Sequence, residues 1–78
     1  MNKKKLLQKV ITNARNISFD ELSLLIEAFG FRLYRVSGSH HIFKRSGIKE
    51  LVNIQNVQGK AKPYQIRQFL SIIERYNL

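Results

Sequence analysis

Residues 31–45, FRLYRVSGSHHIFKR, contain two strand-like runs separated by a Gly-Ser pair. Side chains alternate with a period of two in FRLYRV (31–36) and in HHIFKR (40–45), which is typical of β-strands. Gly38 suits the first central position of a type II′ turn, so we expect a two-residue turn at Gly38 and Ser39. The stretch therefore predicts an antiparallel hairpin, and both histidines of the chain begin its second strand.

Two helices are predicted before the hairpin. Apolar residues at helical spacing over 3–14 indicate a short amphipathic helix. The sequence SFDE at 18–21 fits a capping box, in which the Ser18 hydroxyl accepts from the amide of Glu21 and the Glu21 carboxylate reaches back. A second helix is therefore expected after Ser18, and Gly30 can adopt the left-handed conformation that ends it.

One strand and one helix are predicted after the hairpin. ELVNIQ (50–55) has the strand pattern, and KPYQIRQFLSIIERYNL (62–78) has the helical pattern, with Pro63 acceptable in the first turn. The residues expected in the core between helices and sheet are Leu25, Phe29, Ile66 and Leu70. We therefore predict an α+β fold, a three-stranded antiparallel sheet with helices on one face.

The length of 78 residues favours a single domain over 1–78, with an additional N-terminal helix and connection at 1–16 and the core at 17–78. There is no cysteine, which favours a cytoplasmic setting and excludes disulfides and thiolate-bound zinc. No run reaches the ~20 apolar residues that a membrane span needs, and no membrane partner is expected.

Charge is the strongest global feature of the composition. Lysine and arginine total 14 against 5 acidic residues, for a formal net charge of +9. Solubility alone needs a smaller excess, so this imbalance favours a polyanionic partner, either nucleic acid or an acidic protein. The acidic residues show no clustered spacing for Mg²⁺, and we expect neither a metal nor a cofactor.

The two histidines are expected on opposite faces of the sheet, because adjacent strand residues point in opposite directions. With a two-residue turn and regular pairing, Val36 lies opposite His41 and Tyr34 opposite Phe43. His40 would then share the helix-covered side with Phe31, Leu33 and Ile42. The open face would display Arg32, Tyr34, Val36, His41, Phe43 and Arg45. A three-residue turn would instead return Phe31 and Leu33 to the side of His41, and the pattern leaves this alternative open.

Basic and aromatic side chains on one face are suited to stacking unpaired bases and binding phosphate. A second basic cluster, GKAK at 59–62, places Lys60 and Lys62 just before a helix N-terminus, which favours anions. The competing interpretation of that cluster is a solvated loop. Imidazole can move a proton at cellular pH, but a lone histidine near a strand end is more often a surface or hydrogen-bonded residue than a catalyst.

The runs GFRLYRVSGSHHIF (30–43) and GKAKPYQIRQFL (59–70) resemble the HicA family of small toxins, the RNA-cleaving halves of type II toxin–antitoxin pairs. The likeness covers residues 19–78. The resemblance implies a double-stranded-RNA-binding-domain-like α-β-β-β-α fold, here with an additional N-terminal helix, and an mRNA interferase activity inhibited by a HicB antitoxin. It also implies that His41 is the catalytic histidine and that Gly38 lies in the preceding turn.

Together these inferences predict a metal-independent endoribonuclease with His41 as catalyst and His40 as structural support. The residues expected to contact RNA are Arg35, Gly38, Ser39, Phe43, Lys44, Arg45, Lys60 and Lys62. The expected partners are mRNA or other single-stranded RNA and an acidic HicB-type antitoxin. Two alternatives stay open at this point: a non-catalytic RNA-binding module, and a protein that binds only an acidic protein partner. The sequence does not decide whether His41 acts as base or acid.

Overall fold

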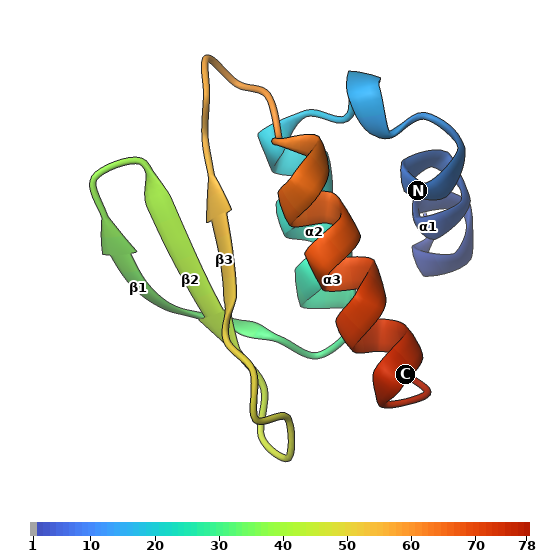
Figure 1. The fold of residues 1–78 in the computed structure, drawn as a ribbon, viewed down its shortest axis with the longest axis vertical. Coiled ribbons are helices and arrows are strands. Elements are labelled where there is room, and N and C mark those ends of the chain that lie inside the picture. Colours follow the sequence, from blue (N-terminus) through green and yellow to red (C-terminus); the bar gives the residue numbers. More distant parts are fainter. Residues whose placement is uncertain (1) are drawn as a thin grey trace.

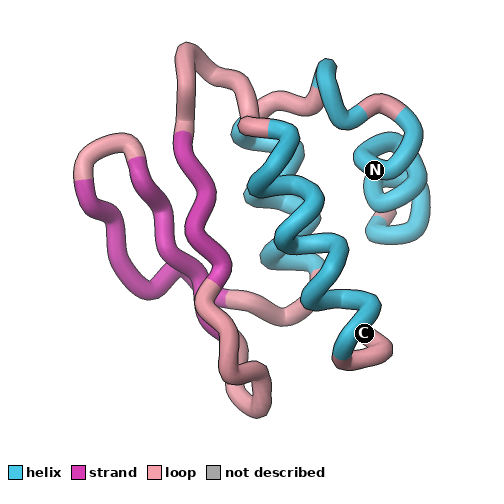
Figure 2. The backbone as a smooth tube through the Cα atoms, in the orientation of Figure 1, coloured by secondary structure: helices cyan, strands magenta, loops and turns pink. Residues whose placement is uncertain are grey.

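The computed structural model describes residues 2–78 and contains three α-helices, one short 3₁₀-helix and one sheet. Figures 1 and 2 show the arrangement of these elements. Their bounds are α1 Lys3–Thr12, η1 Ala14–Asn16, α2 Phe19–Ala28, β1 Arg32–Ser37, β2 His40–Lys44, β3 Val52–Gln55 and α3 Pro63–Arg75. The order from α2 to α3 is α-β-β-β-α, preceded by α1 and the 3₁₀-helix η1. The predicted α+β fold, like that of double-stranded-RNA-binding domains, is confirmed.

The capping box predicted at the start of α2 is present. The Oγ of Ser18 accepts from the amide of Glu21 at 3.0 Å, and the carboxylate of Glu21 accepts from the amide of Ser18 at 3.0 Å. Two amides that the first turn leaves unpaired are thereby satisfied. At the other end of α2, Gly30 has φ +89°, the left-handed conformation expected for it. Pro63 is the first residue of α3, also as predicted.

The elements form layers, with α2 and α3 on one face of the sheet and α1 against α2 on the side away from the sheet (Figure 1). Phe69 of α3 lies near the centre of the core, with its ring edge-on to those of Phe29 and Phe31 at centroid distances of 5.9 and 5.7 Å. Leu25, Phe29 and Ile66 are buried as predicted, but Leu70 is only half-buried. The inward stripe of α3 is centred on Phe69, so Leu70 lies at its flank.

The sheet has the order β1-β2-β3, and both pairs are antiparallel. Gly38 and Ser39 form the two-residue turn that the sequence predicts, with Val36 opposite His41. Gly38 has φ +61° while Ser39 is not left-handed, a combination that fits type II′. The regular register continues to the Arg35–Ile42 pair and ends there. A β-bulge lies at Tyr34, so that Leu33, not Tyr34, pairs with Phe43.

The bulge reverses the expected faces of β2. Phe43 is 3% exposed and pairs with the buried Val52, so Phe43 and, two residues earlier, His41 point toward the helices. His40 and Ile42 point to the open face. The prediction that His41 and Phe43 lie on the open face, with His40 and Ile42 covered, is therefore wrong. Phe43 has more apolar surface to bury than Ile42, and one extra residue in β1 accommodates that choice.

Candidate active site

His41 lies near the end of the sheet where β2 begins, on the side that faces α2. Its imidazole is half-buried and packs edge-on against the ring of Phe19, the first residue of α2, with centroids 4.7 Å apart and planes at 64°. Its sheet neighbours on the same face are Val36 and Ile54. The ring is thus held at the margin of the core, with part of its surface accessible to a ligand.

A backbone carbonyl orients this imidazole. The Nδ1 atom of His41 lies 3.4 Å from the carbonyl oxygen of Ser39. A carbonyl can only accept a hydrogen bond, so this contact requires the proton on Nδ1. The neutral ring then carries its lone pair on Nε2, which is free to accept a proton. The geometry at Ser39 therefore favours the tautomer that a general base needs.

Hydrogen bonds connect the turn at Ser39 to the other elements of the fold. The backbone carbonyl of Ser39 also accepts a hydrogen bond from the backbone amide of Asn56 at 3.0 Å. The side-chain Oγ of Ser39 accepts from Nε2 of Gln55 at 3.2 Å. The backbone amide of Gln55 in turn donates to the side-chain Oε1 of Gln65 at 2.8 Å. Gln65 is 4% exposed and belongs to α3. A chain of contacts therefore runs from α3 through β3 to the turn that orients His41.

Sequence reasoning missed Gln65, Gln55 and Phe19 as members of this site. A signal existed for Gln65, because it is a polar residue directly before Ile66 on the inward stripe of α3. Buried polar side chains are almost always hydrogen-bonded, so such a residue indicates a specific partner. Phe19 had only the signature of a core aromatic residue, and its contact with His41 follows from the tertiary fold.

Lys60 lies in a tight turn that is hydrogen-bonded to the first residue of α2. Val57 and Lys60 exchange two backbone hydrogen bonds at 3.0 and 3.1 Å, and Gln58 and Gly59 between them both have positive φ. The carbonyl of Gly59 accepts from the amide of Phe19 at 2.9 Å. The same residue, Phe19, thus contacts this turn through its backbone and His41 through its ring. Lys60 is exposed on the turn.

Lys62 is the N-cap residue of α3, and its side chain makes no capping hydrogen bond. Its Nζ lies 5.8 Å from the centre of the Tyr64 ring.

His40 is on the open face, where its Nδ1 lies 3.2 Å from Oδ1 of Asn53. Of the predicted site residues, the fold therefore brings His41, Gly38, Ser39 and the segment with Lys60 and Lys62 to one end of the sheet.

The remaining predicted contacts lie elsewhere. Arg35 and Lys44 are exposed on the open face, and the Nζ of Lys44 lies 4.2 Å from the centre of the Tyr34 ring. The Phe43 side chain is in the core, so the prediction that its ring meets RNA is wrong. Arg45, four residues beyond His41, donates from Nη1 to the carbonyl of Phe29 at 2.8 Å. Its guanidinium completes the end of α2 and has a role in the fold.

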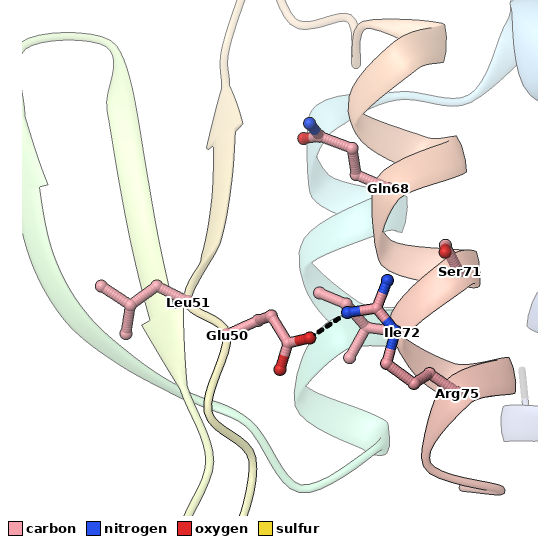
Figure 3. A pocket seen from close by; sticks show the side chains of 6 residues that line it. All are labelled: Glu50, Leu51, Gln68, Ser71, Ile72 and Arg75. Carbon is pink, nitrogen blue, oxygen red and sulfur yellow. Dashed lines mark hydrogen bonds and ion pairs between the residues drawn. The ribbon is translucent and has the colours of Figure 1, made fainter.

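A separate groove of ≈ 290 Å³ lies at the opposite end of the sheet (Figure 3). Its lining residues are Glu50, Leu51, Gln68, Ser71, Ile72 and Arg75. Glu50 pairs with Arg75 and accepts from the hydroxyl of Tyr76 at 2.6 Å. The Tyr76 hydrogen bond is the main cause that lowers the pKa of Glu50, and it raises the pKa of Tyr76. These contacts tie the chain before β3 to the end of α3, away from His41.

Comparison with known proteins identifies the family. The family model described as the HicA toxin of bacterial toxin–antitoxin matches residues 19–74, which include α2, the whole sheet and nearly all of α3. No curated protein and no solved structure matches the chain. Within residues 2–78, no helix combines the length and the apolar character needed to cross a bilayer. The match leaves α1 and η1, with their connections, and residues 75–78 outside the matched segment, and the chain belongs to the HicA toxins of bacterial toxin–antitoxin systems.

Proposed function

We propose that this chain is a cytoplasmic mRNA interferase, a metal-independent endoribonuclease in which His41 is the single catalytic histidine. The observation that carries the proposal is the half-exposed imidazole of His41, with Nδ1 facing the Ser39 carbonyl, inside the segment that matches the toxin family. The proposed substrate is mRNA or other single-stranded RNA. The proposed inhibitor is an acidic HicB-type antitoxin, in keeping with the net charge of +9 on the toxin.

RNA carries its own nucleophile, the 2′-hydroxyl, so one well-placed base can start the reaction. Nε2 of His41 takes the proton of the 2′-hydroxyl, the 2′-oxygen bonds to the adjacent phosphorus, and the bond from phosphorus to the 5′-oxygen breaks. The products are a 2′,3′-cyclic phosphate and a 5′-hydroxyl, whose proton comes from the imidazolium or from water. A positioned general base contributes roughly 10²- to 10⁴-fold to the rate, sufficient for a toxin that inactivates a message with one cut.

Cations near the reacting phosphate stabilise the negative charge that grows on its oxygens. Lys60 and Lys62 are the proposed sources, because Lys60 is exposed on a turn whose backbone contacts Phe19 beneath His41. The tight turn at Gly38 and Ser39 is proposed to let the RNA backbone approach the imidazole. Arg35 and Lys44, on the open face, are proposed to bind flanking phosphates. His40 is proposed to support the sheet through Asn53.

The test is incubation of purified protein with end-labelled single-stranded RNA in EDTA, with His41→Ala as the paired variant. Cleavage by the native chain and its loss in a folded, RNA-binding His41→Ala protein is the expected result. His40→Ala, the matched change on the other face, is expected to retain cleavage. RNA binding without cleavage by the native chain would select the non-catalytic RNA-binding module instead. Absence of both cleavage and binding would leave only the interaction with an acidic protein.

A further inference from the structure

Strand β1 is exposed along its whole length. It is one of the two edge strands of the sheet, with β2 on one side and no strand on the other within residues 2–78. Leu33, Tyr34 and Val36 are 50, 55 and 50% exposed, and they are consecutive or nearly so. In Figure 1 the two covering helices lie beside β3, at the far side of the sheet from β1. An uncovered edge with apolar side chains is a ready template for another strand.

The two faces of β1 carry side chains of different chemistry. Leu33 and Val36 pair with Phe43 and His41, so they point to the helix side of the sheet, beyond the reach of the helices. The bulge places Tyr34 and Arg35 together opposite Ile42, on the open face. The edge therefore offers aliphatic side chains on one face and a ring with cations on the other.

The charge at this edge is positive. Arg32 and Arg35 are exposed on β1, and the ammonium of Lys44 lies over the Tyr34 ring at 4.2 Å. No acidic residue occurs between Phe29 and Lys49, so nothing within the hairpin neutralises these cations. A complementary ligand must carry negative charge, apolar side chains and a backbone that can pair with a strand.

We infer that the free edge of β1 receives an extended acidic segment of a protein partner, which adds a fourth strand to the sheet. Alternating acidic and apolar residues would meet Arg32 and Arg35 on one face and Leu33 and Val36 on the other. A second copy of this chain fits poorly, because two molecules of charge +9 would bring arginines against arginines. RNA can reach Arg35 and Lys44 from the open face, but it has no peptide backbone to pair with the strand edge and no aliphatic side chains to pack against Leu33 and Val36.

The position of the edge suggests how such a partner would inhibit. Val36 lies directly opposite His41 on the same face of the sheet. A strand added outside β1 would run two strand spacings, about 10 Å, from the strand that carries His41. Groups projecting from that strand on the helix side would cover the approach to the imidazole. This step rests on the proposed function, in that the partner would be the antitoxin; the docking edge itself does not depend on nuclease activity.

The test uses the full ¹⁵N-labelled chain and a synthetic nine-residue peptide of alternating valine and glutamate. Two control peptides are alternating valine and lysine, and glutamate with glycine, which keeps the charge without strand propensity. We expect only the valine–glutamate peptide to bind, with slowed amide exchange confined to β1. Val36→Ser should weaken binding about fivefold or more because it removes apolar contact area. Leu24→Ser, at an exposed apolar residue of α2, should leave binding unchanged.

Each other outcome would overturn the inference. Equal binding of the glutamate–glycine peptide would mean that charge alone attracts the ligand. Protection of other segments would place the site elsewhere, and concentration-dependent protection of β1 without peptide would show pairing of two copies. Equally slowed exchange of the same β1 amides by a single-stranded RNA oligonucleotide, added in place of the peptide, would make the strand edge itself an RNA contact. The RNA cleavage assay is scored separately, so an inactive protein that still binds the peptide through β1 would refute the proposed function alone.

Discussion

The imidazole of His41 lies edge-on against the ring of Phe19, with 4.7 Å between ring centroids and 64° between planes. The amide of Phe19 donates to the carbonyl of Gly59 at 2.9 Å, and its neighbour Ser18 caps α2. One residue therefore holds the start of α2 and the Val57–Lys60 turn beside the candidate catalytic group. The orientation of His41 is a property of the fold and is determined by elements far apart in the sequence.

Phe19→Leu should separate this positioning role from packing. Leucine retains most of the buried apolar contact, so we expect a loss of about 1–2 kcal/mol in unfolding free energy. The edge contact with the imidazole is lost, and we expect RNA cleavage to fall about tenfold because the ring is less well oriented. Urea denaturation and single-turnover cleavage measure the two effects.

Phe29→Leu is the matched control, because Phe29 is also buried and lies at the other end of α2, against Phe69. It should lose similar stability and keep its cleavage rate. Equal losses of cleavage in both variants would show that Phe19 acts on activity only through stability.

The hairpin was predictable because Gly38 and Ser39 carry local turn chemistry that needs no tertiary context. The capping box at Ser18 and Glu21 was predictable for the same reason. The bulge at Tyr34 was not, because no glycine or proline marks it. Its cause is tertiary: burial of Phe43 with Val52 and Ile54 decides which face of β2 meets the helices. An interpretation based on regular alternation therefore assigned the side chains of β2 to the wrong faces of the sheet.

In the candidate site, too, the residues placed by local sequence were predicted and those placed by tertiary contacts were not. His41, Gly38 and Ser39 are adjacent in sequence and were predicted together. Gln65 contacts Gln55 across ten residues of chain, and Arg45 contacts Phe29 across sixteen. Contacts of this kind depend on how helices and sheet pack, which residue type and spacing do not reveal.

Gln65→Leu tests the link between α3 and the turn that orients His41. The amide of Gln55 would lose its acceptor, and an unsatisfied buried amide costs about 1–3 kcal/mol. We therefore expect a loss of stability of that size, together with slower cleavage because Gln55 also holds Ser39. Gln68→Leu, on an exposed part of the same helix, is the control and should change neither. A Gln65→Leu protein with native stability would contradict the structural role of this hydrogen bond.

Glu21 should contribute to acid sensitivity. The ammonium of Lys9 is the main cause that holds its pKa below the ordinary value of 4.5, and the Ser18 amide adds to the effect. A carboxyl whose pKa is lower in the folded state stabilises the fold above the unfolded pKa, and that contribution disappears as pH falls through the folded pKa. Glu21→Gln should therefore cost about 0.5–1 kcal/mol at neutral pH, within the range of surface pairs.

The difference between Glu21→Gln and the native chain should shrink as pH falls below 4.5, and it should vanish once pH lies below the lowered pKa of folded Glu21, where both side chains are neutral. Thermal unfolding across this pH range measures it. Glu27→Gln, on the exposed side of the same helix, should show no such convergence. A gap that stays constant with pH would mean that Glu21 acts through its capping hydrogen bonds and not through its charge.

Lys60→Ala combined with Lys62→Ala should weaken RNA binding and flatten its dependence on salt. Each phosphate contact that is removed lowers the slope of log affinity against log salt by about 0.7 for a single strand. Binding of an RNA oligonucleotide by the His41→Ala background, titrated at several salt concentrations, measures the slope without cleavage. Lys4→Ala with Lys5→Ala removes the same charge from exposed positions on α1 and should leave most of the slope intact. Equal flattening by both pairs would indicate net charge and not a local phosphate contact.

Arg45→Ala should have the opposite signature, a loss of stability with little change in the salt dependence of RNA binding. Its guanidinium donates to the Phe29 carbonyl at 2.8 Å and packs over Gly30, where an added Cβ would come within 3.3 Å of Nε. Removing a charged donor from a carbonyl at a helix end costs about 1–3 kcal/mol. Lys44→Ala, at the preceding, exposed position, should stay within about 0.5 kcal/mol of the native stability. Urea denaturation and RNA binding at several salt concentrations are measured for both variants: if Arg45→Ala is as stable as Lys44→Ala and flattens the salt slope, Arg45 contacts RNA and does not complete the end of α2.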